Sequence, residues 1–181
     1  MVEAYALSAG RVELSGLARL HDEGVVRAAA LTVGGASAFL AFEADTVAEL
    51  ERQVHAAREV AGPLEVLLAA GGVIVGPRWP SRILPGPVVA LLHLQAVPGQ
   101  LRELGATLAR REPHAAAYVA GHGAGFLLEW TAEDVDSLAE AVVEAGDLPG
   151  VRSSVLAWTA AELTVGFGGD APRGVGAAQS G

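Results

Sequence analysis

The feature that most constrains the fold is an internal repeat. Residues 121–150 follow the same order as residues 34–62, about 87 positions earlier. Each copy begins with closely spaced glycines, continues as a short apolar strand that starts at Phe39 or Phe126, and ends as an amphipathic helix. A unit repeated along one chain predicts two halves with the same topology.

Apolar residues recur at helical spacing in both copies, which predicts one buried face for each helix. Asp45 and Thr46 precede the first helix, and Thr131-Ala132-Glu133-Asp134 precedes the second, where side-chain oxygens can cap the free N–H groups. The expected buried stripes are Val47, Leu50, Val54, Ala57 and Ala61 in the first helix, and Val135, Leu138, Ala139, Val142 and Val143 in the second.

The remaining segments complete a repeated strand and helix order. Strands are expected at 2–7, 25–33 and 64–68 in the first half and at 88–94, 115–119 and 151–158 in the second, with further helices near Leu17 and Leu104. The order βαββαβ predicts a ferredoxin-like α+β unit, duplicated in tandem. The expected organisation is a first repeat at 1–75, a linker at 76–87, a second repeat at 88–165 and a flexible tail at 166–181.

The strands are apolar nearly throughout, which indicates that both faces of each sheet are buried. Helices cover only one face of such a unit. The antiparallel sheets are therefore expected to pack together or against a partner, as a homo-oligomer or a subunit of a complex. Gly71 and Gly72 begin a stretch rich in glycine and proline that is interpreted as the start of the joint between the halves.

The composition limits the function. The chain has a formal net charge of −9, which argues against binding nucleic acid or an anionic membrane. It contains no cysteine and no run of about 18 apolar residues, so thiolate chemistry and a membrane span are not expected. The N-terminus carries Glu3 where a secretion signal carries positive charge, so a cytoplasmic location is expected.

The glycine-rich turn around Gly121, His122, Gly123 and Gly125 is the most suggestive short motif. Closely spaced glycines allow the backbone to approach a ligand, and a histidine can bind a carboxylate, a metal or a proton. The alternative is a tight turn with an exposed histidine. The spacing does not match a nucleotide-binding fingerprint, because this turn opens a strand and not a helix.

Two other groups of residues are candidates. Arg78 and Arg82 flank Trp79 in the linker, where they could recognise a small anionic ligand or the carboxylates of a partner. The alternative is a solvated linker with one packed tryptophan. His93 lies within an apolar strand and is interpreted as a hydrogen-bonded residue of the core or of a sheet face. No pair of histidines has the spacing of a local metal site, so neither a metal nor a cofactor is expected.

Residues 12–62, which include VGGASAFLAFEADTVAELERQV, together with residues 85–130, which include VPGQLRELGATLARREPHAAAYVAGHGAGFLLEW, resemble the C-terminal cap domain of FAD-linked oxidases of the glycolate oxidase type. His122 sits where some members of that family carry a glycine-flanked histidine. This resemblance implies a substrate-side or scaffold subunit that does not bind flavin alone.

Two further resemblances imply other uses. Residues 88–158, with Val97-Pro98-Gly99 and Leu148-Pro149-Gly150-Val151, are similar to the effector domain of leucine-responsive/asparagine-type regulators, a dimeric α/β barrel. That similarity implies a small-molecule-binding or oligomerising module. The duplicated unit and its length also resemble tandem bacterial microcompartment shell proteins, which implies a self-assembling trimer.

The sequence therefore predicts a duplicated ferredoxin-like protein that is not an enzyme on its own. The hypothesis is a non-catalytic ligand- or partner-binding module related to the oxidase cap. Its expected contact residues are Gly121, His122, Gly123 and Gly125, with Arg78 and Arg82. The alternatives are a self-assembling structural protein and an effector-binding domain.

Overall fold

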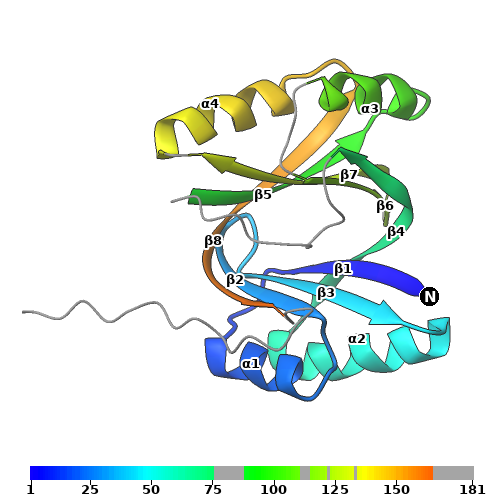
Figure 1. The fold of residues 1–181 in the computed structure, drawn as a ribbon, viewed down its shortest axis with the longest axis vertical. Coiled ribbons are helices and arrows are strands. Elements are labelled where there is room, and N and C mark those ends of the chain that lie inside the picture. Colours follow the sequence, from blue (N-terminus) through cyan, green and yellow to red (C-terminus); the bar gives the residue numbers. More distant parts are fainter. Residues whose placement is uncertain (76–87, 111–114, 122, 133, 165–181) are drawn as a thin grey trace, which may run out of the picture.

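A computed structural model describes residues 1–75, 88–110, 115–121, 123–132 and 134–164 (Figure 1). The described part of the chain alternates strands and helices in two similar series. In order along the chain, the elements are β1 (Val2–Ser8), α1 (Leu14–Asp22), β2 (Ala28–Gly34), β3 (Ala38–Ala44), α2 (Val47–Ala61), β4 (Leu64–Val75), β5 (Val88–Ala96), α3 (Leu101–Ala109), β6 (Ala115–Ala120), β7 (Ala124–Ala132), α4 (Val135–Gly146) and β8 (Val151–Thr164).

Each half has the strand order of a ferredoxin-like unit. The first half is arranged β4-β1-β3-β2 and the second β8-β5-β7-β6, and every neighbouring pair is antiparallel. The helices of both halves lie on the outside, in two layers on opposite sides of the strands (Figure 1). The predicted α+β fold, with a tandem duplication of the βαββαβ order, is confirmed.

The two sheets join edge to edge into one closed barrel with the strand order β1-β3-β2-β8-β5-β7-β6-β4. The junctions are β2–β8 and β4–β6, both antiparallel. The halves thus shelter each other's inner faces by sharing one continuous hydrogen-bonded wall. This closure leaves neither sheet with an open edge among the described strands.

The strands that close the barrel are longer than predicted. β4 pairs with β1 up to Leu68, and from Leu68 onward it pairs with β6. β8 likewise pairs with β5 over its first part and with β2 from Ala157 onward. Gly71 and Gly72, interpreted from sequence as the start of the joint, lie inside β4. Their backbone continues the strand because the second half supplies a neighbour that sequence patterns do not reveal.

The helices begin where the capping residues predict. The side chain of Thr46 accepts a hydrogen bond from the backbone N–H of Glu49, and that of Asp134 accepts one from Ser137. The predicted buried faces of α2 and α4 were wrong at three positions, because Val47, Val135 and Val143 are exposed. Val47 and Val135 lie in the first turn of their helices, and Val143 lies on the side of α4 that faces away from the sheet. The buried positions are Leu50, Val54, Ala57 and Ala61 in α2, and Leu138, Val142 and Ala145 in α4.

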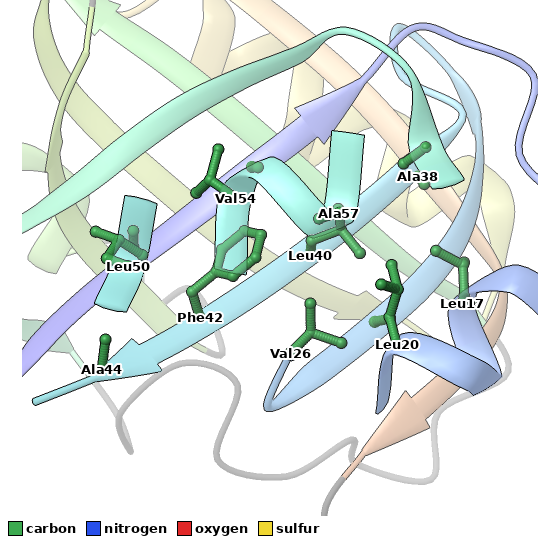
Figure 2. Close-up of a cluster of buried hydrophobic side chains, with 14 residues drawn as sticks. Leu17, Leu20, Val26, Ala38, Leu40, Phe42, Ala44, Leu50, Val54 and Ala57 are labelled. Carbon is green, nitrogen blue, oxygen red and sulfur yellow. The ribbon is translucent and has the colours of Figure 1, made fainter. Parts of the chain in front are cut away.

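The core has three layers. One cluster lies between the first sheet and α1 and α2, where Leu40 and Phe42 of β3 pack against Leu50 and Val54 of α2 (Figure 2). A second lies between the other sheet and α3 and α4. The third fills the interior of the barrel and consists of Tyr5, Leu7, Ala28, Ala30, Ala36, Phe39, Ala41, Leu67, Leu91, Val119, Leu127 and Ala157. Both faces of each sheet are therefore buried, as the apolar strands predict.

The second helices of the two halves are 88 positions apart, as their caps Thr46 and Asp134 show. The hairpin before the second helix is one residue longer in the second half. Ala28 and Ala115 occupy corresponding positions, and their cross-strand partners Ala41 and Glu129 lie 13 and 14 residues further along the chain. Since side chains alternate along a strand, this difference puts Phe39 in the barrel interior but Phe126 on the helix side. The sequence alignment of these two phenylalanines is corrected accordingly.

Candidate functional site

The glycine turn between β6 and β7 packs directly on neighbouring strands. A Cβ atom added to Gly121 would lie 2.8 Å from Leu67 Cδ2 and 3.1 Å from the carbonyl oxygen of Val66, both in β4. One added to Gly125 would overlap the carbonyl oxygen of Leu94 in β5. Glycine at these two positions is therefore explained by close approach of the backbone, before any ligand is considered.

Gly123 is different, because no atom lies within 4 Å of the place where its Cβ would stand. Its carbonyl oxygen accepts a hydrogen bond of 2.9 Å from the N–H of Gly121, which closes the turn. Both glycines are exposed. Of the other predicted contact residues, His122, Arg78 and Arg82 lie outside the described residues, so their predicted roles stay predictions.

His93 lies in β5 between Leu92 and Leu94, which both pack on the helix side of the sheet. Its side chain therefore points into the barrel, and only 4% of the residue is exposed. The predicted burial of His93 is confirmed. No hydrogen bond between its ring and another described residue is found, and the charged residue that it contacts is Glu65.

Glu65 approaches His93 from across the barrel. It lies near the start of β4, between the helix-side residues Leu64 and Val66, so its carboxylate also points inward. The distance from His93 Nδ1 to Glu65 Oε1 is 3.9 Å, and 32% of the Glu65 side chain is exposed. That separation is an electrostatic contact and is too long for a hydrogen bond.

The surroundings determine the charge of this pair. Burial lowers the pKa of His93 below its ordinary value of 6.5, and the carboxylate of Glu65 opposes that shift by a smaller amount. The imidazole of His93 is therefore neutral at neutral pH. The charge of the pair is then that of the partly exposed Glu65 carboxylate.

The predicted turn and the His93–Glu65 pair lie at the same end of the barrel. Gly121 packs on Val66 and Leu67, which directly follow Glu65, and Gly125 packs on Leu94, which directly follows His93. At the same end, Ser153 Oγ donates a hydrogen bond of 2.9 Å to Gln95 Oε1. We call this region, formed by the β6–β7 turn, the start of β4 and the end of β5, the glycine-turn end.

The two halves differ in chemistry at this end. Gly34 lies close to the carbonyl oxygen of Leu156 in β8, and Gly121 lies close to the carbonyl oxygen of Val66 in β4. Leu156 and Val66 are therefore corresponding residues of the two halves. One position earlier on each strand, Val155 corresponds to Glu65. Val155 pairs with His93 across β8 and β5, and Glu65 pairs with Leu7 across β4 and β1. The positions that match Glu65 and His93 are thus the apolar residues Val155 and Leu7.

A second polar group lies at the opposite end of the barrel. Glu3 and Glu43 face each other in the β1–β3 register. Arg27 joins them, with its Nη1 at 3.1 Å from Glu43 Oε2 and 3.8 Å from Glu3 Oε1. This group links β1, β3 and the start of β2, and it acts as a structural clamp.

Sequence reasoning missed Glu65 and Glu129 as inward-facing residues. Glu129 is 4% exposed and lies in β7 between the helix-side residues Leu128 and Trp130. The signal was available: each is a lone carboxylate within an otherwise apolar strand, which is expensive to bury without a purpose. Which residues they approach depends on the closure of the barrel, and that could not be read from the chain.

No protein-family model, no curated protein and no solved structure matches this chain. Across the part of the chain that the structure describes, no three histidine or acidic side chains gather in a group that could hold a metal ion. None of the described helices is both long and apolar enough to cross a membrane.

Proposed function

We propose that the chain is a non-catalytic module that binds a small ligand, or a group presented by a protein partner, at the glycine-turn end of its barrel. The observation that carries this proposal is the His93–Glu65 pair. A buried imidazole and an inward carboxylate lie together at this end of the barrel, beside the apolar residues that line the interior there. The corresponding positions of the other half are the apolar residues Leu7 and Val155, so the fold does not require polar residues at the positions of His93 and Glu65.

Burying polar groups without hydrogen bonds is unfavourable. His93 receives no hydrogen bond from the described residues, and its contact with Glu65 is too long to replace one. A titratable pair placed beside an apolar core is a position where a ligand can add hydrogen bonds. Among the described residues, Gly121 and Gly123 are exposed and Glu65 is partly exposed at this end of the barrel.

Among the three resemblances, the closed barrel favours the effector-domain type, because that family builds an α/β barrel from two copies of one unit. Here two halves of one chain form such a barrel. The similarity is one of fold alone. A role as a subunit beside a separate oxidase component, a homo-oligomeric state and a cytoplasmic location remain parts of the same proposal. The predicted anionic ligand depends on Arg78 and Arg82.

The proposal is tested by a fragment screen with isotope-labelled protein, observed through backbone amide resonances. Fragments that bind should shift the amides of Gly121, Gly125 and Leu94 together. Replacement of His93 by glutamine should weaken those fragments at least tenfold, because it removes the imidazole.

The matched control is His55→Gln, since His55 is exposed on α2 and far from the barrel interior. This variant should bind the fragments as the natural protein does. If the fragments that bind shift only resonances elsewhere, or if His93→Gln binds them equally well, the glycine-turn end is not the ligand site.

A further inference from the structure

The His93–Glu65 pair has the geometry of a two-point receptor for one small polar group. An atom about 2.8 Å from each partner, an ordinary hydrogen-bond length, can complete a triangle on the 3.9 Å base between Nδ1 and Oε1. A single atom of a ligand can therefore lie at hydrogen-bond distance from both side chains. Polar groups more than about 3.5 Å apart can be bridged by a third polar group.

The charges select which polar group fits. We take the neutral imidazole of His93 in the tautomer with its proton on Nε2, which offers an acceptor at Nδ1, and a carboxylate offers only acceptors. The bridging atom should then donate two hydrogen bonds. A primary ammonium has three donors and a positive charge, whereas a hydroxyl has one donor and a carboxylate at neutral pH has none.

The net charge of the chain also favours a cationic ligand. The chain carries a formal net charge of −9, which attracts cations and repels anions. Burial of His93 strengthens its hydrogen bonds and its electrostatic contacts, because the barrel interior is less polar than water. The apolar wall beside the pair, with Leu7 and Leu67, can contact an alkyl chain attached to the ammonium.

We propose that Glu65 and His93 together bind the primary ammonium group of a small amine, with the glycine-turn end as its entrance. This inference rests on the proposed ligand-binding function and adds the class of ligand. It differs from the small anionic ligand expected from Arg78 and Arg82, and the two expectations are separated by experiment.

The experiment is a titration of the full chain at pH 7.5 with three probes of similar size: butylammonium, 1-butanol and butanoate. Binding is followed by the ring resonances of His93 and the amides of Gly121 and Gly125. Butylammonium should bind at least tenfold more tightly than either of the other probes. Glu65→Gln, which keeps the shape of the side chain and removes its charge, should weaken butylammonium at least tenfold.

Glu59→Gln is the matched control, because Glu59 is exposed on α2 and its replacement changes the net charge by the same amount. It should leave the affinity unchanged within twofold. Glu65→Asp, which retracts the carboxylate by one methylene group, should give an intermediate loss. Circular dichroism and the unfolding midpoint of each variant establish that it is folded.

The outcomes separate the two proposals. If butanoate or butanol binds as tightly as butylammonium and shifts the His93 ring, the site is retained and the ammonium class is wrong. If Glu65→Gln and Glu59→Gln weaken butylammonium equally, the effect is one of net charge, and the proposed contact is wrong. If butylammonium shifts none of these resonances at a 50-fold molar excess over the protein, the ammonium inference fails. The fragment screen then still tests the proposed function.

Discussion

Leu7 and His93 hold corresponding places in the two halves, yet one is apolar and the other is titratable. The same is true of Val155 and Glu65. An exchange of this kind changes the chemistry of one end of the barrel while the backbone pairing stays the same. Individual residues, and not the fold, therefore distinguish the candidate site from the matching region around the β2–β3 turn.

Gly125 should tolerate no side chain. Gly125→Ala would place a methyl group on the carbonyl oxygen of Leu94, so β5 and β7 would have to separate. We expect a loss of about 2–4 kcal/mol in the free energy of unfolding, measured by urea denaturation, as for other overpacked core positions. Gly123→Ala is the control and should change stability by less than about 1 kcal/mol, because open space surrounds that position. Equal effects at the two positions would contradict the close approach of β5 and β7.

His93 should make stability depend on pH. Its pKa is lowered in the folded chain, chiefly by burial. An unfolded chain therefore binds a proton near pH 6.5 that the folded chain takes up only at lower pH. The contribution of His93 to the free energy of unfolding is complete above about pH 7, declines as the pH falls toward the folded pKa, and is constant below it.

The variant His93→Gln removes this titration, so its stability should fall less than that of the natural protein between pH 7 and pH 5. Urea unfolding at several pH values measures the difference, and His55→Gln again serves as the control. Parallel pH profiles for the natural protein and His93→Gln would show that His93 is not buried in the neutral form.

At the scale of helices and strands, the sequence predicted what depends on local order. The caps at Thr46 and Asp134, the spacing of Leu50 and Val54, and the alternation of strand and helix all act within a few residues. The extensions of β4 and β8 could not be predicted, because their partners β6 and β2 belong to the other half. The same holds for the candidate site. The glycine turn could be predicted from the sequence, because it is a local motif, whereas the contact between Glu65 and His93 could not, because it joins the two halves.

The clamp formed by Arg27 tests how elements are joined. Arg27→Met should destabilise the protein by about 1–3 kcal/mol, because Glu3 and Glu43 would then face each other without the guanidinium between them. Arg52→Met, at an exposed position of α2, should change stability by less than about 0.5 kcal/mol. Equal stability of the two variants in urea unfolding would show that the clamp contributes nothing.

At the scale of the whole molecule, closure explains why a chain so rich in apolar residues can bury both faces of its sheets. The helices cover the outside and each half covers the inner face of the other. The apolar strands predicted that the inner face of each sheet is buried. They did not indicate whether the other half of the same chain or a second copy of the chain buries it. In this structure the cover comes from the same chain, and oligomerisation becomes a separate question from completion of the barrel.

The central claim is that both junctions between the halves form within one molecule. It is tested most directly by nuclear Overhauser effects between backbone protons of paired residues at the two junctions, Ala30 with Glu162 and Ala69 with Val119. In a mixture of labelled and unlabelled chains, both sets of contacts should arise only within single chains. Contacts at one junction alone, or contacts between different chains, would contradict the closed barrel.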